Sequence, residues 1–144
     1  MVSRVIPVQA FDLVVFGGTG DLAKRKILPS LFRRFVAGQM PNDAFVIGVA
    51  RSELDTEGYQ NLVISALKEF EPELVASAEL EIFIKQIKYV QIDAQSEFGW
   101  SDLANKVRKN AIQAFYFSVS PSLFGQLAEK LHQYSIASQS SRIV

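Results

Sequence analysis

The sequence contains no cysteine among its 144 residues. A disulfide framework, a thiolate nucleophile and a thiolate metal site are therefore excluded. The lack of cysteine is compatible with a reducing compartment, and we expect a cytoplasmic protein that holds no metal.

An excess of charge of one sign is also lacking, because 15 Lys and Arg residues balance 15 Asp and Glu residues. A chain without net charge has no overall attraction for nucleic acid or for an anionic membrane, so we expect neither partner. Any anion-binding site must therefore come from a local cluster of bases.

Long hydrophobic runs are absent as well. The charge-free run FVIGVA (45–50) has the length of a strand, far short of the roughly 20 residues that cross a bilayer. Pro7, Gln9 and Asp12 interrupt the apolar residues of the N-terminal segment, so a secretory signal peptide is not expected.

What the sequence does have is an alternation of short apolar runs with longer segments of helical spacing. This pattern is typical of parallel strands buried on both faces by crossover helices, and it predicts one α/β domain with a mainly parallel sheet. We expect strands at residues 11–16, 45–50, 87–92, 112–119 and 142–144. Because the last run reaches the end of the sequence, we expect a part of a longer protein, without the last strand or strands of the sheet and without a catalytic domain.

The expected helices follow from caps, prolines and apolar spacing. Between the first two strands, Asp21 and Gly38 are start and stop signals, but Pro29 lies between them. An interior proline costs about 3 kcal/mol, so we expect a short first turn, a break near Leu28 and a second helix that begins at Pro29. Further helices are expected at 55–70 with Asp55 as N-cap, at about 73–86, within 94–110, and at 120–134 with Ser120 as N-cap and Pro121 as the first helical residue.

The stretch FGGTGDLAKRK (16–26) places three glycines within four residues. A hairpin turn is the simplest interpretation, but the residues that follow do not alternate as a partner strand would. A mononucleotide P-loop would need Gly-Lys-Ser/Thr, whereas Gly20 is followed by Asp21. The remaining interpretation is a shortened dinucleotide-binding fingerprint, Gly17-x-x-Gly20-x-x-Ala23, which predicts a doubly wound, Rossmann-like fold with helices on both faces of the sheet.

Each residue of this fingerprint has a physical role. Gly17 lets the chain leave the strand sharply, Gly20 lets the backbone approach a pyrophosphate, and Ala23 keeps the helix close to the sheet. Free N–H groups at the start of the helix would face the anion. We expect the carboxylate of Asp21 to cap such N–H groups rather than to face the ligand.

The end of the second strand indicates which dinucleotide binds. NAD sites place an acid there for the ribose hydroxyls, whereas this chain has Arg51 and Ser52. A charge-assisted hydrogen bond from Arg51 to a 2′-phosphate would favour NADP over NAD by about 10- to 100-fold. Arg51 as a solvated surface residue is the alternative, and Glu53 nearby leaves weaker binding of NAD open.

Four stretches together resemble the coenzyme domain of the glucose-6-phosphate dehydrogenase family: FGGTGDLAKRKILPSLF, IGVARSEL, FYFSVSPSLFGQLAEKL and the terminal SRIV. The most specific part is Gly-Asp-Leu-Ala followed at fixed spacing by Lys26 and Pro29. The resemblance implies oxidation of glucose 6-phosphate to 6-phosphogluconolactone by NADP, the first step of the pentose phosphate pathway. It also implies a homo-oligomer assembled through the absent domain.

The resemblance also implies the contacts of individual residues. Thr19 and Arg51 would bind the 2′-phosphate, the backbone of residues 18–22 the pyrophosphate, and Lys26 would lie between the cofactor and the substrate phosphate. The pair Asp93-Ala94 would lie near adenine, and Ser118 and Ser120 depart from the residues that family members carry near nicotinamide. The full set expected at the cofactor is Gly17, Gly18, Thr19, Gly20, Asp21, Leu22, Lys26, Arg51, Ser52, Asp93, Ala94, Ser120 and Pro121.

No catalytic residue is expected in the chain. In the family a Glu-Lys-Pro segment and an Asp-His pair with the general base lie beyond the residues present, and we expect the one histidine, His132, to lie at the surface. The chain alone is therefore expected to be inactive. An NADP-sensing module without catalysis is the alternative, whereas a short-chain reductase would need Tyr-x-x-x-Lys, a spacing that no tyrosine of the chain shows. The bases at 24–26 and 33–34 lack the aromatic platform of a nucleic-acid site.

Overall fold

The computed structural model describes residues 10–41, 43–109, 111–137 and 142–143. Its centre is a parallel five-stranded sheet in the order β3-β2-β1-β4-β5. The strands are β1 (Phe11–Phe16), β2 (Ala44–Ala50), β3 (Ile87–Gln91), β4 (Ile112–Phe117) and β5 (Arg142–Ile143). The expected α/β class and parallel sheet are confirmed. The first strand has the expected range, the other four differ from theirs by one or two residues at one end, and Val144 lies outside the described residues.

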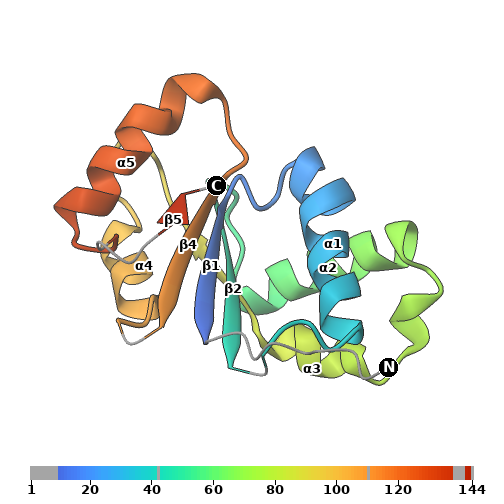
Figure 1. Cartoon of the computed structure of the whole chain (residues 1–144). Helices are drawn as coiled ribbons and strands as arrows, with labels where there is room; N and C mark the ends of the chain where they lie inside the picture. Colours follow the sequence, from blue (N-terminus) through green and yellow to red (C-terminus); the bar gives the residue numbers. More distant parts are fainter. Residues whose placement is uncertain (1–9, 42, 110, 138–141, 144) are drawn as a thin grey trace.

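Helices cover both faces of the sheet, as in a doubly wound fold (Figure 1). On one face lie α1 (Leu28–Val36), α2 (Thr56–Phe70) and α3 (Glu79–Lys85), and on the other lie α4 (Trp100–Lys106) and α5 (Phe124–Gln133). Three short helical turns complete the set: η1 (Ala23–Ile27), η2 (Leu74–Ala76) and η3 (Pro121–Leu123).

Two hydrophobic cores result, one on each face. Phe32, Tyr59 and Phe83 are fully buried on the α1–α2–α3 face. Trp100 and Phe115 are fully buried on the α4–α5 face. Because β1 and β2 contribute apolar side chains to both cores, their sequences read as continuous hydrophobic runs rather than as alternating patterns.

The expected helix over 55–70 is confirmed as α2, with its cap. The Asp55 carboxylate accepts a hydrogen bond from the Gly58 N–H at 2.7 Å, which satisfies one N–H that the first turn of the helix leaves without a partner. Tyr59, Val63 and Leu67 then face the core at helical spacing.

The expected break near Leu28 is wrong. The chain is helical from Asp21 to Val36, and η1 is a π-type turn in which the Leu28 N–H bonds to the C=O of Ala23. The wider turn lets Pro29 stand within the first turn of α1, where its missing N–H and fixed φ are tolerated. The proline therefore changes the helix type before it instead of interrupting the helix.

Two other helices are shorter than expected. The segment 73–86 forms η2 and the separate helix α3 instead of one helix. The helix expected from residue 120 begins as the 3₁₀ turn η3, in which Pro121 takes the first turn but Ser120 makes no side-chain cap hydrogen bond. Its α-helical part, α5, starts only at Phe124.

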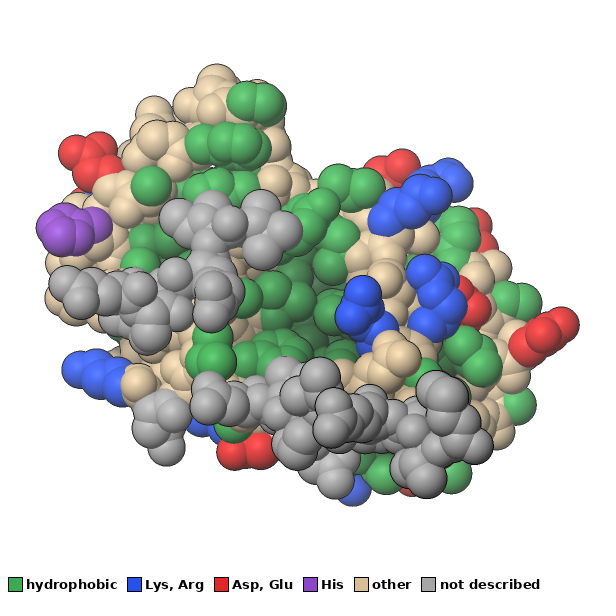
Figure 2. All heavy atoms as spheres, viewed as in Figure 1, with side chains coloured by type: hydrophobic (Ala, Val, Ile, Leu, Met, Phe, Trp, Pro, Cys, Tyr) green, Lys and Arg blue, Asp and Glu red, His purple; other side chains and the backbone are tan. Residues whose placement is uncertain are grey.

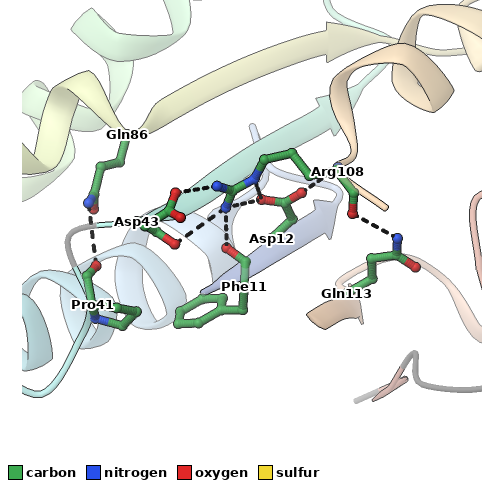
Figure 3. Close-up of polar contacts among 7 residues, drawn as sticks. All are labelled: Phe11, Asp12, Pro41, Asp43, Gln86, Arg108 and Gln113. Atoms are coloured by element: carbon green, nitrogen blue, oxygen red, sulfur yellow. Dashed lines mark hydrogen bonds and ion pairs between the residues drawn. The ribbon is translucent and has the colours of Figure 1, made fainter. Parts of the chain in front are cut away.

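A charged cluster joins three strands at the edge of the sheet opposite the carboxyl ends (Figure 3). The fully buried Asp12 accepts hydrogen bonds from Arg108, through its N–H at 2.6 Å, Nε at 2.9 Å and Nη2 at 2.7 Å. Arg108 also pairs with Asp43 and lies over the Phe45 ring, 4.2 Å from the ring centroid. The carboxylates and the aromatic face together satisfy the guanidinium, so this cluster fastens the amino edge of the sheet.

Within the described part of the chain, the helices are too short or too polar to cross a membrane.

Candidate functional site

The site is built where the first strand ends. Gly17 follows β1 with φ +83, and a Cβ there would lie 2.1 Å from the Ser118 carbonyl oxygen, so only glycine fits. The N–H groups of Gly17 and Gly18 both donate to the C=O of Val49, at 2.8 and 3.1 Å. The sharp exit expected at Gly17 is therefore present, and the loop is held against the end of β2.

Gly18 has a different role from the one that the resemblance implied. Its N–H is bonded to Val49, and its C=O accepts a hydrogen bond from the Tyr59 hydroxyl at 2.9 Å. A Cβ at Gly18 would lie 2.8 Å from that hydroxyl oxygen. Gly18 thus packs the loop onto α2 and has no free N–H for a pyrophosphate.

The free N–H groups lie one turn further along. The Gly20 N–H donates to the Gly17 C=O at 2.9 Å, and the first helical bond runs from the Lys24 N–H to the Gly20 C=O at 3.1 Å. The N–H groups of residues 21–23 therefore have no partner within the helix. A Cβ at Gly20 would meet only the Gly17 carbonyl oxygen, at 3.2 Å, so its outer side is open to a ligand. Such a helix start suits an anion.

Asp21 does not cap the helix as expected. Its exposed carboxylate accepts a hydrogen bond from Arg25 Nε at 2.8 Å, one turn along the same helix. The hydrogen bond from Arg25 to Asp21 raises the pKa of that guanidinium above its ordinary value. The pair leaves the backbone N–H groups beside Asp21 uncovered.

Arg51, Ser52 and Thr19 come together from two loops. The Thr19 and Ser52 hydroxyl oxygens lie 3.3 Å apart, and Arg51 is exposed beside them. The Gln91 amide donates to the Arg51 C=O at 3.1 Å, which fixes the backbone of the loop while its side chain stays free to meet a ligand. Thr19 and Arg51, which the resemblance implied as contacts of one phosphate, thus line the same cleft, together with Ser52.

Two tyrosines that the sequence did not single out support both loops. Tyr89 donates its hydroxyl to the C=O groups of Ala50 and Ser52, at 3.1 and 2.6 Å, and its ring stacks on Tyr59 with centroids 5.0 Å apart. Burial raises the pKa of both phenols, so both remain neutral hydrogen-bond donors at physiological pH. Their signal in the sequence is weak, because a tyrosine in a strand or on an apolar helical stripe is usually a core residue.

The loops enclose a cleft of about 560 Å³ at the carboxyl ends of β1, β2 and β3. The expected residues that line it are Gly17, Thr19, Arg51, Ser52, Asp93, Ala94 and Ser120. Six others do not line it: Gly18, Gly20, Asp21, Leu22, Lys26 and Pro121. The lining that sequence reasoning missed is mostly apolar: Phe16, Val49, Ala50, Ile92, Gln95, Val119, Ser122, Leu123 and Leu127. Figure 2 shows one face of the molecule, which is hollowed between the α5 side and the α1 side, with hydrophobic side chains along the hollow.

The loop after β3 closes one side of this cleft. The Asp93 carboxylate accepts a hydrogen bond from the Gln95 N–H at 3.0 Å, and the Asp93 C=O accepts one from the Trp100 indole at 3.3 Å. Glu97 pairs with Lys130 of α5, and hydrogen bonds from Lys130 and Tyr134 lower the pKa of this carboxyl. The loop is therefore tied to α5 as well as to β3.

The described residues offer binding groups but no acid–base pair. His132 is exposed on α5, as expected, and it does not line the cleft. No group of three or more His, Asp and Glu side chains that could hold a metal occurs among the residues that the structure describes. The arrangement can bind a dinucleotide: N–H groups and hydroxyls for phosphates, a guanidinium at one end and an apolar floor between.

The parallel sheet, the glycine turn and the cleft at the carboxyl edge define a dinucleotide-binding domain of the Rossmann type. A sequence model of one such family, "Glucose-6-phosphate dehydrogenase, NAD binding domain", matches residues 14–144. The chain belongs to this family, whose cofactor is a nicotinamide dinucleotide.

Similar proteins are consistent with this assignment. The glucose-6-phosphate 1-dehydrogenase of Rhizobium meliloti (strain 1021) is 41% identical over 100% of the chain and 30% of its own length. The enzyme of Gluconobacter oxydans (strain 621H) is 38% identical over 95% of the chain and 29% of its own length. The chain thus spans about a third of the length of the curated relatives it matches.

Solved structures share the fold. A glucose-6-phosphate dehydrogenase in complex with glucose 6-phosphate is 25% identical with a TM-score of 0.78, over 96% of this chain and 30% of that chain. The enzyme from Mycobacterium avium is 24% identical with a TM-score of 0.83, over 94% of this chain and 29% of that one, and shows the fold alone.

Proposed function

We propose that the chain is the coenzyme-binding part of an NADP-dependent glucose-6-phosphate dehydrogenase. The observation that carries this proposal is the meeting of Thr19, Ser52 and the exposed Arg51 at the mouth of a cleft that begins at a glycine turn. Two hydroxyls and a guanidinium are the donors that a phosphate monoester on the ribose requires. The names of the curated relatives support glucose 6-phosphate as the substrate of the whole enzyme.

The charges near this end of the cleft favour NADP over NAD. An NAD site would place a carboxylate where it can accept hydrogen bonds from the ribose hydroxyls. Glu53 is exposed and does not line the cleft, whereas Arg51 does. A carboxylate facing a 2′-phosphate would repel it. Asp93 also lines the cleft, but its carboxylate accepts a hydrogen bond from the Gln95 N–H, and the exposed Arg51 guanidinium supports the phosphorylated cofactor.

The chain's own groups account for binding and orientation. The helix start at residues 21–23 lies outside the cleft lining but directly follows Thr19, which lines it, so its free N–H groups can bind the pyrophosphate. The residues of the Arg51 loop bind the 2′-phosphate, and the apolar floor excludes water from the rings. Lys26 is exposed outside the cleft, where it could meet the substrate phosphate in the whole enzyme. Hydride transfer from C1 of the sugar also needs a base for its hydroxyl proton, which we place in the remainder of the protein together with the contacts of a homo-oligomer. The cytoplasmic location and the place at the start of the pentose phosphate pathway stay predictions.

Calorimetric titration of the chain with NADP, NAD and 2′,5′-ADP tests this proposal. We expect NADP and 2′,5′-ADP to bind about 10- to 100-fold more tightly than NAD. Equal affinities for NADP and NAD would remove the role of Arg51. Turnover of glucose 6-phosphate by the 144-residue chain alone would contradict the assignment of the base to another part of the protein.

A further inference from the structure

One large aromatic side chain lies in water beside the cleft. Phe98 is 58% exposed, the highest value among the exposed large hydrophobic residues that the structure describes. A single exposed phenyl needs no explanation by itself, but this one lines a hollow of about 320 Å³ together with Arg51, Gln91, Ile92 and Asp93. Three of these residues, Arg51, Ile92 and Asp93, also line the dinucleotide cleft, so the hollow is its continuation.

Hydrogen bonds fix the backbone that carries the phenyl. The Phe98 N–H donates to the Ser96 hydroxyl at 3.2 Å, and the Phe98 C=O accepts a hydrogen bond from the Asp93 N–H at 3.3 Å. The following residue, Gly99, has φ +87, and a Cβ there would lie 2.0 Å from the Gln91 carbonyl oxygen. The loop thus folds back on the end of β3 in a way that only glycine permits, and it brings Phe98 next to that strand end.

The hollow combines two flat groups with a polar edge. The Arg51 guanidinium and the Phe98 ring are both planar and exposed, and each can stack on an aromatic ring. Gln91 and Asp93 supply an amide and a carboxylate at the floor. A flat heteroaromatic base with a polar edge matches these groups better than a sugar or a phosphate does.

We propose that Phe98 is a base-stacking residue of the cofactor site, which packs against the adenine ring while Arg51 meets the neighbouring 2′-phosphate. This inference rests on the proposed function, because the base is that of the dinucleotide. Phe98 acts on the base that NADP, NAD and 2′,5′-ADP share, whereas Arg51 distinguishes the ligands that carry a 2′-phosphate. The two residues therefore have different ligand profiles.

Titration of Phe98→Ala with the three ligands tests the inference. We expect all three to bind about tenfold more weakly, by the same factor, because base stacking does not depend on the 2′-phosphate. Ile82→Ala, at another large side chain that is 50% exposed, is the matched control and should leave all three affinities unchanged. Phe98→Trp should keep the affinity, and the added tryptophan's fluorescence should be quenched on binding. The unaltered protein, whose Trp100 is fully buried, gives the background signal to subtract.

Each outcome decides between the two proposals. If the unaltered chain binds 2′,5′-ADP and Phe98→Ala binds it within twofold, stacking is refuted and the proposed function stands. If Phe98→Ala and Phe98→Trp weaken binding equally, Phe98 only shapes the loop and the inference is wrong. If the unaltered chain binds none of the three ligands, both proposals fall.

Discussion

At the scale of single residues, the proposed preference for NADP depends on Arg51, whose guanidinium has no partner among the ion pairs of the described residues. Arg51 is exposed, its backbone is fixed by Gln91, and its neighbours Thr19 and Ser52 are hydroxyl residues. An unpaired cation can give its whole hydrogen-bonding capacity to an arriving anion. We therefore expect the side chain to contribute most to binding when the ligand carries a 2′-phosphate.

We expect Arg51→Met to weaken NADP and 2′,5′-ADP binding by about 10- to 100-fold and to leave NAD binding within about twofold. The methionine keeps much of the apolar length of the side chain and removes the charge. Isothermal titration measures the three affinities, and Arg34→Met, at an exposed arginine of α1, is the control. An equal loss for NAD and NADP would show that Arg51 acts on a feature common to both.

The Tyr59 hydroxyl supports the glycine loop through its hydrogen bond to the Gly18 C=O. In Tyr59→Phe the buried Gly18 carbonyl oxygen would lose the hydroxyl donor, and a buried group without a partner costs about 1–3 kcal/mol of unfolding free energy. Urea denaturation measures the loss. Tyr116→Phe, at a half-buried tyrosine whose hydroxyl makes no hydrogen bond within the described residues, should change stability little.

The same phenol makes stability depend on alkaline pH. Burial raises the folded-state pKa of Tyr59, so the fold favours the neutral form. That contribution is complete below the ordinary tyrosine pKa of about 10, and it is lost progressively as the pH rises above it. We expect the unfolding free energy to fall between about pH 10 and 12, less steeply in Tyr59→Phe, as followed by urea titrations at each pH. A parallel fall in both proteins would assign the effect to other groups.

At the scale of secondary-structure elements, the sequence predicted best those features that depend only on residues close together in the chain. The apolar run at residues 11–16 predicted both ends of β1, and Asp55 predicted the start of α2. A buried strand and an N-cap are local features of the sequence. The π turn before Pro29 was missed because a proline excludes one hydrogen bond but does not say how the helix adapts. Gly18 was misassigned because its partner, Tyr59, lies 41 residues away.

The turn after β1 gives a direct test of this reasoning. Gly17→Ala would place a methyl group 2.1 Å from the Ser118 carbonyl oxygen and would force a left-handed φ on alanine. We expect a destabilisation of more than about 2 kcal/mol together with loss of dinucleotide binding.

Gly125→Ala is the contrasting variant. It lies in α5 with open space around it, so it should stabilise the protein by about 0.5–1 kcal/mol through the higher helix propensity of alanine. Thermal unfolding of the two variants compares them, and similar stabilities would contradict the geometry of the turn.

At the scale of the whole molecule, the carboxyl and amino edges of the sheet differ in function: one forms the binding cleft and the other stabilises the fold. The carboxyl edge carries the cleft and its free donors, while the amino edge carries the cluster of Asp12, Asp43 and Arg108. Figure 3 shows how one guanidinium reaches the carboxylates of Asp12 and Asp43 and the backbone carbonyls of Phe11 and Asp43. This cluster could not be predicted from the sequence, because its members are separated by up to 96 residues.

We expect Arg108→Met to destabilise the fold by about 3–5 kcal/mol, because it leaves the fully buried Asp12 carboxylate without its partner. The double variant with Asp12→Asn should recover part of this loss, which a double-mutant cycle in urea measures. Dinucleotide affinity of the folded fraction should stay unchanged, since neither residue lines the cleft. Simple additivity of the two substitutions would contradict a direct interaction.

The π turn has a consequence for the lengths of chain that the fold accepts. An α-helix rotates by about 100° for each residue, so adding or removing a residue inside α1 would swing Leu28, Phe32 and Phe35 away from the sheet. Within residues 23–27, however, the wide turn already holds one residue more than an α-helical turn of the same sweep. Deleting one residue there would restore ordinary helical geometry and leave the buried stripe in phase, so this chain should accept a one-residue deletion in this segment without rebuilding its core.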